Sequence, residues 1–224
     1  MTDSHVASFR QKEDEQLLQK QVLPPLDAPL TLLEAPLPRY PSFLLNDTSS
    51  KARGDVTVSF EIMPSGLVGT EVIRQLEAEG HEALRLVRRK PTSPKEVEWN
   101  PAAGYIQEGI METIDAVVNM AGATTGKIPW TAKYKEEIVS SRLDSTRTLV
   151  KAMAAAKRRP SVLVSGSASG FYGDTGEKIL HETAPKGTGF LSDLAHEWEQ
   201  EALKAPTDVR VVLARTTMVM SRKL

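Results

Sequence analysis

Beyond about residue 55, short apolar runs alternate with longer segments in which apolar residues recur every three or four positions. The short runs predict β-strands at residues 83–87, 115–120, 161–165 and 209–214. The longer segments predict helices at residues 70–79, 131–140, 143–157 and 191–203. Such alternation is typical of parallel βαβ units. We therefore expect an α/β fold, a Rossmann-like doubly wound parallel sheet.

An additional strand is expected over residues 55–62, but its pattern differs from the others. It reads DVTVSFEI, with a polar residue at every second position, which suits a strand with one wet face. In a doubly wound sheet this strand would be central and covered on both sides, and Glu61 would then need a partner. The alternating pattern of residues 55–62 therefore differs from the one expected of a central strand.

The first 54 residues differ in kind from the rest of the chain. Six of the 14 prolines fall between Pro24 and Pro41, which predicts an extended, linker-like segment. We expect an N-terminal extension at residues 1–54 and one domain at residues 55–224. Two interpretations of the first 64 residues remain open. They are a genuine extension, or unrelated sequence has replaced the original first strand and its glycine.

Composition narrows the function classes. With 28 basic and 29 acidic residues, no basic face is indicated for nucleic acid or anionic membranes. No apolar run is long enough to span a bilayer, so we expect a soluble, cytoplasmic protein. Cysteine is absent, the four histidines are far apart, and the acidic positions 197, 199 and 201 suggest a solvated helix face. We expect no metal site.

A glycine loop precedes the first predicted helix. Its residues are Ser65, Gly66, Leu67, Val68 and Gly69. A glycine loop that opens a helix directs free backbone N–H groups at an anion, usually a phosphate. A G-x-x-G-x-x-G loop would place its first glycine at position 63, where this chain has Met63. The sequence predicts a dinucleotide-binding loop with one defect.

Arg88 and Arg89 end the strand that follows, nineteen and twenty residues past Gly69. At this position of a Rossmann unit an acid binds the 2′-hydroxyl of NAD, whereas arginine accommodates the 2′-phosphate of NADP. No acid lies between Ala83 and Lys90. NADP is therefore favoured over NAD, with a solvated basic strand end as the alternative.

Two further strand ends carry candidate residues. Asn119, Ala121 and Gly122 end one strand, where small residues permit close approach of a ligand. Ser165, Ser167 and Tyr172 follow the next strand, and their hydroxyls could bond a substrate carbonyl or hydroxyl. A free phenol, of pKa about 10, is a poor acid at neutral pH unless a cation lies beside it. An ordinary turn and a Gly/Ser loop are the alternatives.

Together these segments resemble the extended short-chain dehydrogenases/reductases, in particular an atypical, sugar-epimerase-like subgroup of unknown substrate. The similar segments are residues 65–69, 86–89, 99–101, 116–122, 130–135, 141–147, 164–167, 187–191 and 211–215. The resemblance implies NADP(H) laid over the strand ends. It assigns residues 65–69 to the pyrophosphate, Arg88 and Arg89 to the 2′-phosphate, Ala121 and Gly122 to the cofactor's middle, and Ser165 and Ser167 to the nicotinamide. Asn119 is also expected to bind the cofactor.

The chain also departs from this family. The tyrosine and lysine that usually act as acid/base correspond to Leu191 and Ala195, and the C-terminal substrate segment is expected to be missing. Three functions follow: an NADP(H)-dependent oxidoreductase or epimerase using Ser167 and Tyr172, a non-catalytic NADP-binding protein, or an inactive truncated fragment. The sequence specifies neither the small-molecule substrate nor the oligomeric state.

Overall fold

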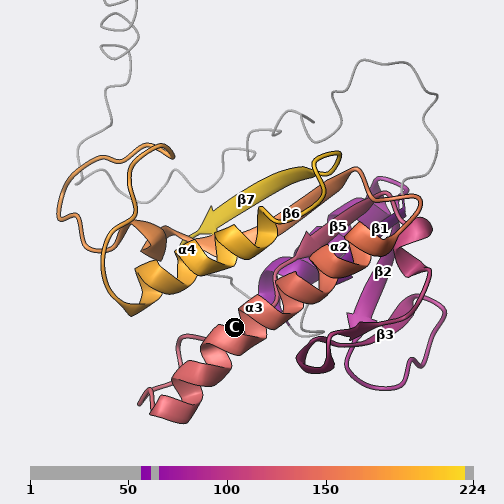
Figure 1. The fold of residues 1–224 in the computed structure, drawn as a ribbon, viewed down its shortest axis with the longest axis horizontal. Helices are drawn as coiled ribbons and strands as arrows, with labels where there is room; N and C mark the ends of the chain where they lie inside the picture. Colours follow the sequence, from indigo (N-terminus) through magenta and orange to yellow (C-terminus); the bar gives the residue numbers. More distant parts are fainter. Residues whose placement is uncertain (1–56, 62–65, 220–224) are drawn as a thin grey trace, which may run out of the picture. The chain divides into compact units, whose positions relative to one another are not determined.

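The computed structural model describes residues 66–219 and the backbone of residues 57–61. The strands are β1 (Thr57–Glu61), β2 (Glu82–Val87), β3 (Glu96–Asn100), β4 (Tyr105–Ile106), β5 (Ala116–Asn119), β6 (Val162–Ala168) and β7 (Arg210–Thr216). The α-helices are α2 (Leu67–Ala78), α3 (Ala132–Ala155) and α4 (Phe190–Ala202). Short 3-10 helices occupy Pro101–Ala103, Ile110–Glu112 and Ser169–Tyr172. The fold class expected from the sequence is confirmed (Figure 1).

Across the described residues the strands form one sheet in the order β4-β3-β2-β1-β5-β6-β7. All neighbours pair in parallel except β3 and β4, which are antiparallel. Because the order reverses between β1 and β5, their carboxyl ends form the switch point at which doubly wound sheets bind ligands. The strand β1 is central, as the fold class requires, and its unusual side chains lie outside the description.

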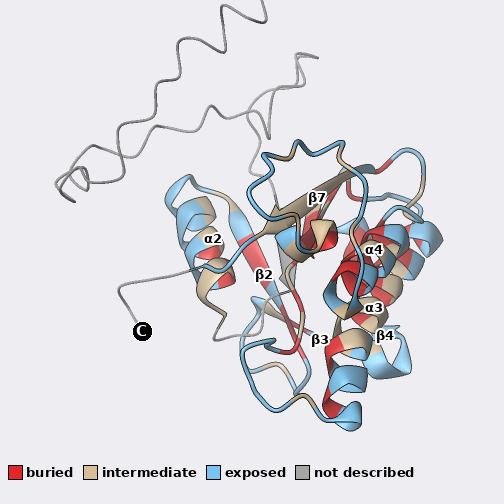
Figure 2. Ribbon diagram, turned by 90° about the vertical axis from the view of Figure 1, so that its left-hand side faces the viewer, coloured by how far each residue is buried: buried red, intermediate tan, exposed pale blue. Residues whose placement is uncertain are grey.

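The sheet is covered on both faces. Val117 of β5 packs with Leu149 and Met153 of α3, whereas its neighbours Ala116 and Val118 pack against Ile73 of α2. Since successive side chains of a strand point to opposite faces, α2 covers one face and α3 covers the other. The helices α3 and α4 contact each other over that second face (Figure 1). Figure 2 shows most of β2 and the inward sides of α3 and α4 as buried.

The expectation of two helices at residues 131–140 and 143–157 is wrong, because α3 is continuous from Ala132 to Ala155. The junction contains Ser140, Ser141 and Arg142, with no glycine or proline that would stop a helix. The Ser141 hydroxyl donates to the Ile138 carbonyl and accepts the Ala123 N–H at 2.9 Å. A polar junction that suggested a break in fact ties the helix to the loop after β5.

The strands β3 and β4 were not expected. In β3 the glutamates Glu96 and Glu98 alternate with Val97 and Trp99, which are buried to 3% and 2% exposure. This is a half-buried strand pattern of only five residues, and β4 is shorter still. No helix in the described part of the chain is long and apolar enough to cross a membrane.

Candidate functional site at the carboxyl ends of the strands

A cavity of about 240 Å³ lies beside the switch point. It is formed by the ends of β2 and β3, the loop after β5 and one side of α3. Its lining includes Val87, Arg88, Asn100, Ala121, Gly122 and Ser141. The sheet therefore brings three residues expected to bind cofactor, Arg88, Ala121 and Gly122, to one cavity.

The two candidate arginines at the end of β2 have different surroundings. Arg89 donates two hydrogen bonds, of 2.6 and 2.8 Å, to the Glu96 carboxylate, which also accepts the Thr92 N–H at 2.7 Å. These bonds lower the pKa of Glu96 to about 2. Arg88 is exposed at the cavity, and no carboxylate pairs with it in the described part of the chain. Arg88 is therefore available for an anion, whereas Arg89 is committed to its own loop.

The glycine loop is described from Gly66 onward, and Ser65, Met63 and Pro64 lie outside the described residues. Gly66 caps α2, Leu67 and Val68 form its first turn, and Gly69 is buried. No side chain caps this helix. The first N–H groups of a helix have no intrahelical partner, so they are free for an anion at this edge of the sheet.

The Asn119 side chain is hydrogen-bonded inside the protein. It has no exposed surface; its amide donates to Thr146 at 2.9 Å and its oxygen accepts the Ala121 N–H at 3.1 Å. The Thr146 hydroxyl also accepts the indole N–H of Trp198 at 2.9 Å. This buried network fixes the start of the Ala121–Gly122 loop, and the cofactor contact expected for Asn119 stays a prediction.

Ser165 is likewise fully buried, and its hydroxyl donates to the neighbouring Gly166 carbonyl at 3.2 Å. The Ser167 hydroxyl donates to the Glu199 carboxylate at 2.5 Å and is 3% exposed. Both serines occupy the strand end expected from the sequence, but they are bonded inside the protein.

Tyr172 belongs to a charged cluster on the same strand end. Arg215 of β7 donates to its phenol oxygen at 2.7 Å and makes a bidentate pair with Glu199, at 2.7 and 2.8 Å. The Arg215 guanidinium also lies 3.7 Å from the centre of the Phe171 ring. The cationic neighbour that a phenol needs in order to act as an acid is therefore present.

Glu199 is the centre of this cluster and is only 3% exposed. Burial raises the pKa of the Glu199 carboxyl. The hydrogen bonds from Arg215 and Ser167 lower it by more than burial raises it, so the net pKa lies below its usual range. The bonds to Glu199 also raise the pKa of Arg215. The cluster is an ion pair at the pH of a cell.

The expectation that position 199 lies on a solvated helix face is wrong. Glu199 lies with Ala195, Trp198 and Ala202 on the buried side of α4, whereas Glu197 is exposed. Its spacing, four residues after Ala195 and three before Ala202, could have identified it. Leu191 and Ala195, which correspond to the usual tyrosine and lysine of the family, lie in the first two turns of α4.

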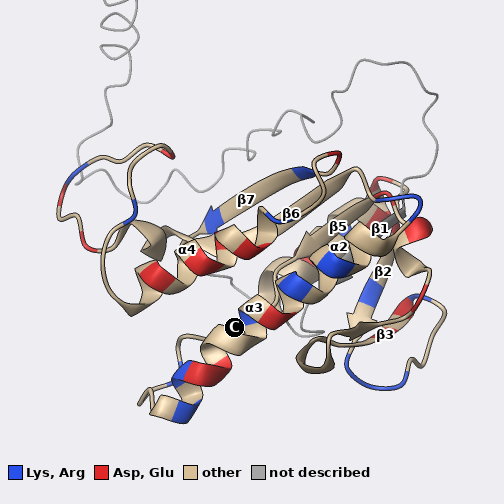
Figure 3. Ribbon diagram, viewed as in Figure 1, with Lys and Arg blue, Asp and Glu red and all other residues tan. Residues whose placement is uncertain are grey.

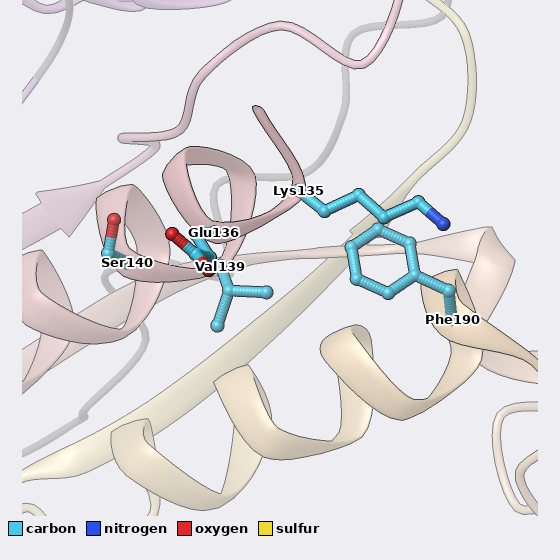
Figure 4. Close-up of a pocket in the computed structure, with 5 residues that line it drawn as sticks. All are labelled: Lys135, Glu136, Val139, Ser140 and Phe190. Carbon is cyan, nitrogen blue, oxygen red and sulfur yellow. The ribbon is translucent and has the colours of Figure 1, made fainter. Parts of the chain in front are cut away.

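A second hollow, of about 430 Å³, lies between α3 and the start of α4. Its lining residues are Lys135, Glu136, Val139, Ser140 and Phe190. Figure 4 shows the Lys135 side chain extending along the Phe190 ring, and its ammonium lies 5.4 Å from the ring centre. Ser140 lines both this hollow and the switch-point cavity, but no residue from a strand end lines the hollow.

The described part of the chain contains no group of three residues that could hold a metal ion. Figure 3 shows basic and acidic positions interspersed along α3, whereas the charged positions of α4 are all acidic. The carboxyl ends of the strands thus offer anion recognition at Arg88 and at the start of α2, and a phenol with a cationic partner at Tyr172.

Both the sequence and the fold are similar to those of known proteins. The chain is 36% identical over 160 residues to an epimerase family protein of Mycobacterium leprae, over 71% of this chain and 52% of the relative. It is 31% identical to a Corynebacterium glutamicum nucleoside-diphosphate sugar epimerase of known structure, with TM-score 0.62 over 72% of this chain and 34% of that chain.

A third similar protein is human epimerase family protein SDR39U1, whose crystal structure was determined with NADPH. It is 27% identical, with TM-score 0.64, over 75% of this chain and 55% of that chain. The chain spans about half the length of the curated relatives that it matches. The model of the NAD dependent epimerase/dehydratase family matches residues 64–223. The chain belongs to that family.

Proposed function

We propose that this chain binds NADP(H) over the carboxyl ends of its strands and acts as an oxidoreductase or epimerase on a hydroxyl or carbonyl carbon of a small molecule. The observation that carries the proposal is Arg88, an arginine with no carboxylate partner in the described residues, placed on the switch-point cavity. Arginine suits the 2′-phosphate that distinguishes NADP from NAD. The NADPH in the human relative's structure supports the same choice.

The residues present fit such a cofactor. The start of α2 offers free N–H groups for the pyrophosphate. Ala121 and Gly122 line the cavity with little or no side chain, although the space of a Cβ at Gly122 is itself filled by the Arg142 guanidinium. When bound, the nicotinamide would supply or accept the hydride. The protein's part is then to orient the reacting carbon and to move one proton.

Tyr172 is the group we assign to the proton transfer. Because Arg215 donates to the phenol oxygen, the phenol's own hydrogen is free for a substrate carbonyl oxygen. Arg215 also stabilises the negative charge left on the oxygen once the proton has gone. Ser167 takes a positioning role, since its hydroxyl donates to Glu199 and holds the carboxylate that orients Arg215.

A second function is favoured by one specific observation. The positions of the usual tyrosine and lysine are Leu191 and Ala195, which carry no acid or base. A chain that kept the cofactor site and lost turnover would be a non-catalytic NADP-binding protein. The third possibility is a truncated fragment that binds no cofactor. NADPH binding in the titration below would exclude it, and an absence of binding would support it.

The cofactor proposal is tested by titrating the full chain with NADPH and NADH while following nicotinamide fluorescence. Hydrogen bonds to charged groups contribute about 1.5–3 kcal/mol each. Arg88→Ala should therefore weaken NADPH binding about 10- to 100-fold and change NADH binding less than about twofold.

Arg85→Ala is the matched control, because Arg85 is an exposed arginine of the same strand that does not line the cavity. It removes the same charge and should leave both affinities unchanged. An equal loss of NADPH and NADH binding in Arg88→Ala, or no loss, would refute the assignment of Arg88. Failure of the unaltered chain to bind NADPH at high micromolar concentration would refute the proposed function.

A further inference from the structure

Arg142 of α3 is a half-buried arginine without an acidic partner. Its Nη1 donates to the Ala123 carbonyl at 3.1 Å and to the Ile138 carbonyl at 2.9 Å. No carboxylate forms an ion pair with it in the described residues, and its Nε and Nη2 donate to no described group. Burial lowers the pKa of its guanidinium. Arg142 thus carries a charge that the described protein does not neutralise.

The guanidinium is held in a fixed plane. On one side it packs against Gly122, where an added Cβ would lie only 2.7 Å from Cζ of Arg142. It also lies 5.3 Å from the centre of the Trp198 ring. The indole is itself fixed by its hydrogen bond to Thr146. Glycine at position 122 therefore makes room for this cation.

Arg142 and Arg88 are held beside different strands of the sheet. Arg142 lies beneath the loop that follows β5, whereas Arg88 follows β2 on the other side of β1. Trp198 also closes on Gly166 of β6, the strand that carries Ser167, since an added Cβ there would lie 2.7 Å from the indole. Arg142 is thus held between the loop after β5 and Trp198 of α4.

We propose that Arg142 binds an acidic group of the substrate, a carboxylate, at the loop formed by residues 121–123. The Nε and Nη2 groups form the edge of the guanidinium that meets a carboxylate in two parallel hydrogen bonds. The substrate class is then a small molecule with a carboxylate near its reacting hydroxyl or carbonyl carbon. This proposal rests on the proposed function for the reaction, but the anion site can be measured separately.

The test uses the full chain and follows its thermal unfolding midpoint in sodium acetate, sodium phosphate and sodium chloride at equal ionic strength. Acetate should raise the midpoint in a saturable way and more than chloride does. Arg142→Gln should weaken the acetate affinity about tenfold or more, and Arg142→Met provides a second uncharged variant if the first folds poorly. Arg142→Lys should give an intermediate loss, because it keeps the charge but not the two-pronged edge.

Arg147→Gln is the control, since Arg147 lies on the same helix but is already paired with Asp144 and Glu201. It should keep the acetate effect. Equal effects of acetate and chloride, or an acetate effect retained in Arg142→Gln, would overturn the proposal. A response to phosphate alone would overturn the carboxylate assignment and identify a phosphate site.

NADPH binding separates the two proposals. Arg142→Gln should bind NADPH within about twofold of the unaltered chain, and acetate should not displace NADPH. A parallel loss of NADPH affinity would mean that Arg142 meets the cofactor's own phosphates, which overturns the substrate site. If the unaltered chain binds acetate through Arg142 but binds no NADPH, the proposed function fails while the anion site stands.

Discussion

The pair formed by Glu199 and Arg215 dominates the site at the scale of single residues. Both side chains are largely covered, at 4% and 20% exposure. Removing one partner of a buried ion pair is costly because the other charge stays desolvated. Sequence reasoning identified Ser167 and Tyr172 from their place at a strand end, but it missed the two charges that connect them. The reason is physical: Arg215 and Glu199 meet only because β7 and α4 pack beside β6.

Glu199→Gln should therefore reduce the free energy of unfolding by about 3–5 kcal/mol, since it leaves Arg215 without its counter-charge. Tyr172→Phe should cost only about 1 kcal/mol, because it removes one hydrogen bond while Arg215 keeps Glu199. Urea unfolding of the two variants at neutral pH compares these losses. Similar losses for both variants would show that the pair is not the main source of stability in this cluster.

At the scale of elements, the connection from β2 to β3 determines which arginine is available. Arg89 closes this connection on Glu96, the first residue of β3, and Thr92 adds its N–H to the same carboxylate. The sequence placed both arginines correctly at the end of β2, but it could not choose between them. That choice depends on β3, whose five residues carry too short a pattern to be recognised.

The continuity of α3 could not be predicted either. Ser140 and Ser141 suggest a break when only their weak helix preference is considered. In the structure Ser141 bonds the loop after β5, and Arg142, the next residue, lies against Gly122 of that loop. Residues that interrupt the apolar pattern of a helix are here the ones that connect it to the site.

The hydrogen bonds that Glu96 accepts from Arg89 and Thr92 predict that stability depends on pH. The folded protein holds the pKa of Glu96 at about 2, against 4.5 for a free carboxyl, so the charged form is favoured on folding. A depressed pKa contributes stability above about pH 4.5, and that contribution is lost as the pH falls toward 2. Glu96→Gln should thus be less stable than the unaltered chain at pH 6, and the difference should shrink below pH 4.5.

Urea unfolding midpoints measured from pH 6 down to pH 3 check this dependence. Glu98→Gln is the matched control, because Glu98 is an exposed glutamate of the same strand. The difference in unfolding midpoint between Glu98→Gln and the unaltered chain should not shrink in this way as the pH falls. A Glu96→Gln difference that is unchanged across the range would contradict the ion pair with Arg89.

At the scale of the whole molecule, one sheet edge collects residues that lie far apart in the sequence. Gly66, Arg88, Gly122 and Tyr172 follow four different strands, and the parallel pairing brings those strand ends to the same side. This arrangement was predictable, because the alternation of strand and helix already implies it. The identity of the proton donor was harder to predict, since the usual positions hold Leu191 and Ala195 and the candidate Tyr172 depends on a partner 43 residues away.

Binding and turnover can be separated on the same molecule. A ligand that binds only the folded chain stabilises it by about 2.7 kcal/mol at 100 times its dissociation constant, so saturating NADPH should raise the thermal midpoint clearly. Tyr172→Phe should show the same rise, because Tyr172 does not line the Arg88 cavity.

If the chain is an enzyme, Tyr172→Phe should lose NADPH oxidation with carboxylate-bearing carbonyl compounds by about 100-fold or more. Turnover that survives in Tyr172→Phe would remove this residue from the proton transfer. Binding without turnover in the unaltered chain would instead identify a non-catalytic NADP-binding protein.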